Sequence, residues 1–176
     1  MNMKVYIPMA TGQMLETGVE ESIQAQTVPC EIVPCYTPGV IESQRNFGAD
    51  RHQGEIASRQ LCVDMASKTN DEFVCMQDRD IVHLNTCNIW EMQEFLITHA
   101  HWGAVSLYWK DIPDKRHLQS HVRITCVMVR TALFKWINWA EYSTRPCRCA
   151  TFKEQINAME YEYGYLDCTK RIEEVF

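Results

Sequence analysis

The chain has 176 residues, enough for one domain with a hydrophobic core and too few for two ordinary domains, so we expect a single domain over residues 1–176. Its composition, 46% hydrophobic and 23% charged, is that of a soluble globular protein, and no segment approaches the roughly 20 apolar residues of a membrane span. The net charge of −6 argues against a general nucleic-acid binder, and the amino terminus lacks the long hydrophobic region of a signal peptide, which predicts a cytoplasmic protein.

Strands and helices are predicted to alternate along the chain. Apolar runs predict strands at residues 3–9, 30–39, 72–77, 103–109 and 122–129, and helical periodicity predicts helices at 14–26, 55–68, 85–100 and 151–163. Pro34 inside the second strand indicates an edge position or a bulge. This alternation predicts an α/β fold in which helices flank one mostly parallel, Rossmann-like sheet.

The nine cysteines do not form the even set of a disulfide-bonded framework. Cys62, Cys75 and Cys126 lie within apolar runs, so we expect them to be small core residues with reduced thiols. Cys147 and Cys149 are close enough to suggest a metal or redox site, but they lack the second close Cys or His pair that zinc spacing requires.

Two carboxylates follow the predicted strand 72–77 in the segment Asp78-Arg79-Asp80. In open α/β sheets, ligands bind beyond the carboxyl ends of the strands, and a pair of acids there invites a cation. By itself, an Asp-x-Asp motif is weak evidence for a cation site, because in most proteins such acids lie in loops and are exposed to solvent. The ordered set of elements around it raises its value.

That ordered set resembles the family 2 glycosyltransferases of the GT-A fold. The resemblance covers roughly residues 3–130 and rests on the segments VYIPMATG, VEESIQAQTVPCEIV and ASRQLCVDMASKTNDEFVCMQDRDIVHLNTCNIWEM. It implies a nucleotide-diphospho-sugar donor, an acceptor that the sequence does not identify, and Mn²⁺ or Mg²⁺ as cofactor. It also implies that Asp80 is the direct metal ligand and that Asp78 contacts the ribose or holds a metal-bound water.

The chemistry supports a cation at this place independently of the resemblance. When a sugar nucleotide reacts, negative charge builds on the departing diphosphate, and a divalent cation held by one or two carboxylates would neutralise it. Arg59 is expected either to hydrogen-bond the nucleotide or to pair with Asp78, with a helix-surface salt bridge as the alternative. Arg79 is expected to be a surface residue or to lie behind the site.

The turn after the first strand is a second candidate contact for the nucleotide. Pro8, Ala10 and Thr11 stand there with Gly12, and small residues allow close approach of the backbone to a base or ribose. The resemblance implies the same contact. An ordinary strand-to-helix turn is the alternative interpretation.

Several departures from the family leave the mechanism open. No acidic residue that could recognise the base follows the second strand, and no histidine that could complete the metal site lies beyond His121. Glu154 is the one candidate for the general base, and the alternative is that it is an exposed glutamate on a helix. His117 and His121 are four residues apart but are expected at the surface rather than in a zinc site.

Two other functional classes therefore stay open. One is a catalytically degenerate GT-A-fold protein that binds a nucleotide or a partner. The other is a sugar-nucleotide nucleotidyltransferase, which would need a glycine-rich loop with Arg and Lys after the first strand. The segment MATGQMLETG contains neither basic residue.

Overall fold

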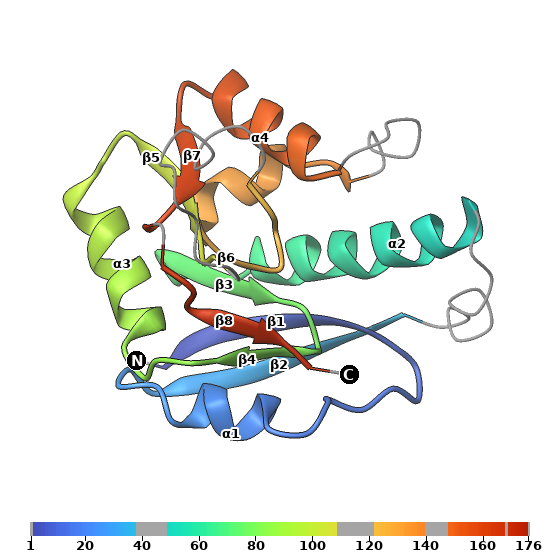
Figure 1. The fold of residues 1–176 in the computed structure, drawn as a ribbon. Helices are drawn as coiled ribbons and strands as arrows, with labels where there is room; N and C mark the ends of the chain where they lie inside the picture. The colour runs from blue at the N-terminus through green and yellow to red at the C-terminus, as the bar shows by residue number, and fades with distance from the viewer. Residues whose placement is uncertain (1, 38–48, 109–121, 140–147, 168, 176) are drawn as a thin grey trace.

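The computed structural model describes residues 2–37, 49–108, 122–139, 148–167 and 169–175 (Figure 1). Its main sheet has six strands in the order β2-β1-β3-β6-β5-β7, and a second sheet pairs β4 with β8. The strands are β1 (Met3–Ala10), β2 (Cys30–Thr37), β3 (Phe73–Gln77), β4 (Ile81–His83), β5 (Trp102–Ser106), β6 (Cys126–Arg130), β7 (Glu162–Tyr165) and β8 (Ile172–Glu174). The helices are α1 (Val19–Gln24), α2 (Ala49–Ala66), α3 (Asn88–Thr98) and α4 (Arg148–Ala158), with a 3-10 helix η3 (Thr131–Trp136).

The main sheet is mostly parallel. β1 pairs in parallel with β2 and β3, and β5 pairs in parallel with β7, whereas β6 is antiparallel to both β3 and β5. β6 therefore runs against the other strands, and the predicted α/β fold is confirmed. Pro34 lies on the edge strand β2, opposite Ile7, as the sequence indicated.

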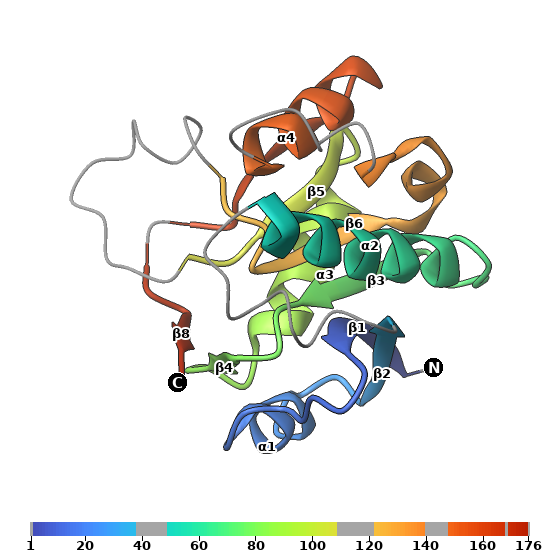
Figure 2. The same ribbon diagram turned by 90° about the vertical axis from the view of Figure 1, so that its right-hand side faces the viewer.

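Helices cover both faces of this sheet (Figures 1 and 2). On one face, Val74 of β3 belongs to a core cluster with Phe152 of α4 and residues of α2 and η3. On the other face, Cys75 packs in a cluster with Ile23 of α1 and Met92 of α3, which also includes residues of β4 and β8. Successive β3 side chains point to opposite faces, and all are buried because both faces are covered.

The helix predicted at 14–26 is wrong for its first residues. α1 begins only at Val19, after Gly18, whose φ of 85° is in the left-handed region. A glycine adopts this conformation at low cost and is unfavourable inside a helix. Residues 14–18 instead belong to the loop between β1 and α1.

The helix predicted at 151–163 is also wrong at its end. α4 ends at Ala158, and Glu160, with a φ of 64°, lies between it and β7. Tyr163 and Tyr165 then pair with Ala104 and Ser106 of β5. The alternating tyrosines of EYGY are typical of a strand, and pairing with β5 decides the conformation there.

The other differences are smaller. Of the strand predicted at 122–129, residues 122–125 precede β6 and are not in a strand. Residues 38, 39 and 109, at the ends of two other predicted strands, lie outside the described residues. The three-residue strands β4 and β8 were not predicted, because three residues carry too little periodicity to be recognised.

The core cysteines were predicted correctly. Cys62, Cys75 and Cys126 are each 0% exposed, and each is a free thiol. Within the described ranges, the helices are all too short or too polar to cross a lipid bilayer.

Candidate functional site

The acids Asp78 and Asp80 lie at the carboxyl end of the buried central strand β3, as predicted. Asp78 directly follows Gln77, the last residue of β3, and its backbone N–H donates to the Thr125 carbonyl at 2.8 Å. The Ile81 N–H donates back to the Asp78 carbonyl at 3.3 Å. Residues 78–81 thus form a tight turn, called the acidic turn below, which leads from β3 into β4.

Asp78 is held by an arginine from helix α2. An Arg59 amino group lies 2.5 Å from Asp78 Oδ1, and the other donates to the Ile124 carbonyl at 3.4 Å. Arg59 is 4% exposed, and its guanidinium lies 5.8 Å from the Trp139 ring centre. The structure therefore shows the expected pair with Asp78, in which Arg59 is buried and Asp78 is 24% exposed, rather than a bridge on the helix surface. A contact of Arg59 with the nucleotide stays a prediction.

Asp80 has a different electrostatic environment. Burial raises the pKa of this half-buried carboxyl, and the charges of Glu174 and Glu16 raise it further, against the lowering effects of its own backbone N–H and of Arg79. Each neighbouring acid has its own arginine: Arg79 pairs with Glu16, and Arg123 lies 2.8 Å from Glu174.

Asp78 is likewise paired, with Arg59. Among the residues that the structure describes, the Asp80 carboxylate makes no ion pair. Of the four described acids Glu16, Asp78, Asp80 and Glu174, Asp80 is therefore the one without an arginine partner.

The turn after β1 lies at the same end of the sheet as the acidic turn, because β1 and β3 are parallel and both turns follow the carboxyl end of a strand. Tyr6 pairs with Met76, so Pro8 and Asp78 each stand two residues beyond that pair. The exposed Thr11 donates to the Thr37 carbonyl through both its N–H and its hydroxyl, each at 3.1 Å. Strand pairing therefore brings the two predicted nucleotide contacts together.

Two local hydrogen bonds close this turn. The N–H of the buried Ala10 donates to Gln13 Oε1 at 2.7 Å, and the Gln13 N–H donates to the Ala10 carbonyl at 3.0 Å. Gly12, with φ of 85°, supplies the left-handed residue that the reversal needs. The contact of Pro8, Ala10 and Thr11 with a nucleotide stays a prediction.

Arg79 joins the acidic turn to the loop before α1. Its guanidinium donates to the Met14 carbonyl at 3.3 Å and pairs with Glu16, whose N–H donates to the Arg79 carbonyl at 3.2 Å. The sequence placed Arg79 at the surface or behind the site but gave no indication of this contact, because Glu16 is 63 residues away.

The carboxyl-terminal segment also contacts the acidic turn. The Val175 N–H donates to the Asp80 carbonyl at 2.8 Å, and β8 pairs with β4, Ile81 opposite Glu174. Both views show β4 and β8 side by side (Figures 1 and 2). The sequence analysis predicted no element in this segment.

The proposed general base, Glu154, lies on α4 and is exposed. Phe152 and Ile156 of the same helix are each 0% exposed and pack into the core. Since residues two apart point to nearly opposite sides of a helix, Glu154 lies on the outer face of α4. A role for it as a base stays a prediction.

The described residues hold no cluster of three or more His, Cys, Asp or Glu side chains that could bind a metal by themselves. The zinc alternatives involved His117, His121 and Cys147, which lie outside the described residues, and Cys149, which packs beside the core. Mg²⁺ commonly binds through one or two carboxylates together with waters and substrate phosphates. Asp80, with Asp78 beside it, fits this kind of site.

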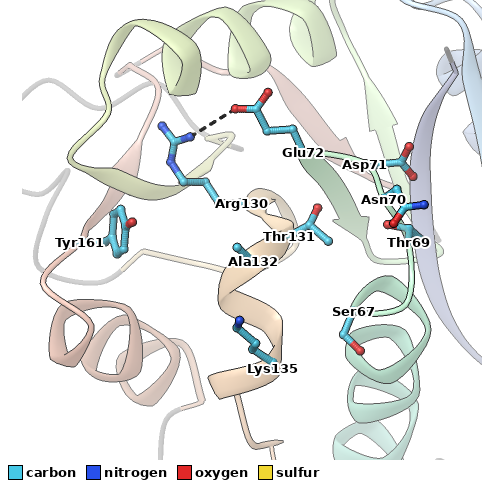
Figure 3. Close-up of a pocket in the computed structure, with 10 residues that line it drawn as sticks. All are labelled: Ser67, Thr69, Asn70, Asp71, Glu72, Arg130, Thr131, Ala132, Lys135 and Tyr161. Atoms are coloured by element: carbon cyan, nitrogen blue, oxygen red, sulfur yellow. Dashed lines mark ion pairs between the residues drawn. The ribbon is translucent and has the colours of Figure 1, made fainter.

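A cavity of about 510 Å³ lies at the other end of the strands, beside the amino end of β3 (Figure 3). It is lined by the loop before β3, the start of η3 and Tyr161. Arg130 and Lys135 are the basic side chains that line it. Arg130 lies 3.8 Å from Glu72 and donates to the carbonyls of Trp102, at 2.8 Å, and Leu96, at 2.5 Å. Arg130 therefore holds the end of α3 against β6, and the cavity lies away from the acidic turn.

Comparison with solved structures identifies the fold. S. aureus TarS superposes with a TM-score of 0.63 at 16% identity, over 100% of this chain and 37% of TarS. TarS 1–349 in complex with UDP gives 0.59 at 18% identity, over 100% of this chain and 61% of that one. The fold is that of the GT-A glycosyltransferases.

A third neighbour is glucosyl-3-phosphoglycerate synthase from Mycobacterium tuberculosis, in complex with Mn²⁺, UDP and phosphoglyceric acid. Its TM-score is 0.53 at 10% identity, over 94% of this chain and 68% of the synthase. No protein-family model and no curated protein sequence matches the chain. The chain spans less than two thirds of the TarS structures, so the likeness concerns the fold.

Proposed function

We propose that this chain is a glycosyltransferase domain, related to family 2, that uses Mn²⁺ or Mg²⁺ to transfer a sugar from a nucleotide-diphosphate donor. The fold neighbours are nucleotide-sugar glycosyltransferases, and some were solved with UDP and Mn²⁺. Because their sequence identity to this chain is low, the activity has to be argued from the residues of this chain itself.

The observation that carries the proposal is that the Asp80 carboxylate makes no ion pair among the described residues. Its carboxylate is half-buried beside Glu16 and Glu174, each of which has an arginine partner. A partly buried charge without a counter-ion is costly, and a divalent cation bound there would remove that cost. The raised pKa of Asp80 has the same origin, because burial and neighbouring acids disfavour its ionised form.

Each residue of the site then has a separate task. Asp80 binds the cation, and Arg59 orients the Asp78 carboxylate, which contacts a ribose hydroxyl or a metal-bound water. Pro8 and Thr11 border the base and ribose from the end of β1. When bound, the divalent ion supplies positive charge to the departing diphosphate.

A thermal-shift panel tests the proposal. UDP, GDP, CDP, ADP and dTDP are compared with and without Mn²⁺, because a ligand that binds the folded chain raises its melting temperature by mass action. We expect one diphosphate to give a Mn²⁺-dependent shift that Asp80→Asn removes. Glu94→Gln, which changes an exposed acid on α3, is the matched control and should keep the shift.

The panel also separates the alternatives. A wild-type chain that shows no Mn²⁺-dependent shift with any diphosphate, or an Asp80→Asn variant that keeps the shift, contradicts the assigned metal site. A Mn²⁺-dependent shift without release of diphosphate from the matching sugar nucleotides, alone or with candidate acceptors, would favour the catalytically degenerate binding protein.

A further inference from the structure

The acidic turn is braced from within the protein by a buried side chain. Gln77, the last residue of β3, is 0% exposed, and its Nε2 donates to the Ile81 carbonyl at 2.7 Å. Ile81 is also the residue whose N–H closes the turn onto Asp78 at 3.3 Å. The Gln77 amide therefore joins the two ends of the acidic turn, on either side of Asp80.

The other end of the Gln77 amide is held by a histidine. His83, on β4, is 7% exposed, and its Nε2 lies 2.7 Å from Gln77 Oε1. Because an amide oxygen only accepts, the ring nitrogen facing it carries the proton. His83 Nδ1 is then the acceptor, and Asn88 Nδ2 donates to it at 3.2 Å.

The chain of hydrogen bonds ends in the carboxyl-terminal segment. Asn88 Nδ2 also donates to the Arg171 carbonyl at 2.9 Å, and an Arg171 amino group donates to Asn88 Oδ1 at 3.2 Å. Arg171 itself pairs with Glu91 and with Asp167, the latter at 2.5 Å. The relay Gln77–His83–Asn88–Arg171 thus connects β3, β4, α3 and the segment before β8 (Figure 1).

The donors and acceptors of this relay fit together in only one arrangement. Reversing the Gln77 amide would set its NH₂ against the protonated His83 nitrogen and its oxygen against the Ile81 carbonyl, and both bonds would be lost. A buried polar group that loses its hydrogen-bond partner destabilises the folded state. The relay therefore resists movement of the carbonyl that ends the acidic turn.

The acids make such a brace necessary. The charges of Glu16 and Glu174 act against the ionised form of Asp80, so without a brace the Asp80 carboxylate could turn away from them. We propose that Gln77 and His83 are positioning residues, which hold the acidic turn so that Asp80 keeps the orientation needed to bind the cation. This inference rests on the proposed function.

The chain offers a matched control in a second buried glutamine. The Gln77 side chain makes three hydrogen bonds, since its Oε1 also accepts from Cys126 Sγ at 3.8 Å. Gln26 is 7% exposed and makes three as well: its Nε2 donates to the carbonyls of Ser22 and Asn85, at 3.1 and 3.0 Å, and its Oε1 accepts from the Ile89 N–H at 3.1 Å. None of these three partners belongs to the acidic turn. Gln77→Met and Gln26→Met should therefore lose similar stability but differ at the site.

The experiment measures Mn²⁺ affinity and nucleotide affinity separately. Free Mn²⁺ is followed by electron paramagnetic resonance in the presence of the diphosphate that gives the largest shift in the panel above. Binding of the same diphosphate without metal is followed by calorimetry. We expect Gln77→Met to weaken Mn²⁺ binding at least tenfold and to leave metal-free nucleotide binding within twofold. Gln26→Met should leave both within twofold.

A third variant is measured alongside, so that the test stands if Gln77→Met does not fold. His83→Phe keeps a ring of similar size and the Gln77 amide but removes the bond that orients it, and should weaken Mn²⁺ binding about threefold to tenfold. Unchanged Mn²⁺ affinity in each folded variant, or an equal loss in Gln26→Met, overturns the positioning role. A wild-type chain that binds no Mn²⁺ with any diphosphate contradicts the proposed function instead.

Discussion

The buried histidine of the relay makes the stability of the fold depend on pH in a predictable way. Burial lowers the pKa of His83 to about 4, from 6.5 for a free imidazole. The unfolded chain therefore takes up a proton at a pH where the folded chain does not. The contribution of the neutral His83 to the free energy of unfolding is therefore fully present above pH 6.5. It is lost progressively as the pH drops from 6.5 toward 4.

The size of the effect follows from the two pKa values. The full difference corresponds to about 3 kcal/mol, of which about 2 kcal/mol is already lost at pH 5. A single domain is commonly stable by about 5–15 kcal/mol, so this loss is large enough to measure. Carboxylates also titrate toward pH 5, and a comparison between variants is needed to isolate the histidine.

The assay is urea unfolding at pH 7.5 and pH 5 for the wild type, His83→Gln and His101→Gln. His101 is an exposed histidine near Glu162, with 61% of its side chain accessible, and serves as the control. We expect the wild type and His101→Gln to lose about 2 kcal/mol more than His83→Gln between the two pH values. If all three chains lose the same free energy, the assignment of the pH dependence to His83 is wrong.

Three further changes test the packing and the charge pair. Arg59→Met should cost about 3 kcal/mol in urea unfolding, because it leaves Asp78 without its partner, and Asp78→Asn in the same chain should recover part of the loss; an additive double variant would refute the coupling. Gly103→Ala should cost about 1–3 kcal/mol, since the added Cβ would lie 2.7 Å from Leu133 Cδ1 and 2.8 Å from Tyr161 Cβ, and an unchanged urea midpoint would contradict that clash. Phe152→Ala should cost about 3–5 kcal/mol, because its ring is buried against Trp139 and Tyr163. The control Trp136→Ala, at a side chain that is 68% exposed, should change the urea midpoint little. Equal losses in the two variants would contradict the assignment of the core.

Much of the architecture could be predicted from local sequence. The run FVCMQ reads as a strand buried on both faces, and the two acids that follow it had to lie where that strand ends. Pro34 indicated an edge strand for the same local reason, since it cannot donate a hydrogen bond to a neighbouring strand. These features depend only on residues that are close together in the sequence, so they can be predicted without knowing how the separate elements pack.

The electrostatic character of the site was decided only by the tertiary structure. Arg79 meets Glu16, Arg123 meets Glu174 and Gln77 meets His83 through the packing of separate elements, and no spacing in the sequence marks these partners. The sequence named Asp78 and Asp80 as a pair of acids and Arg59 as a possible partner of Asp78, but it could not show that this ion pair forms or which arginines reach the acids near Asp80. That difference arises because the packing of α2 brings Arg59 to Asp78, whereas the acids whose charges act on Asp80 already have arginine partners.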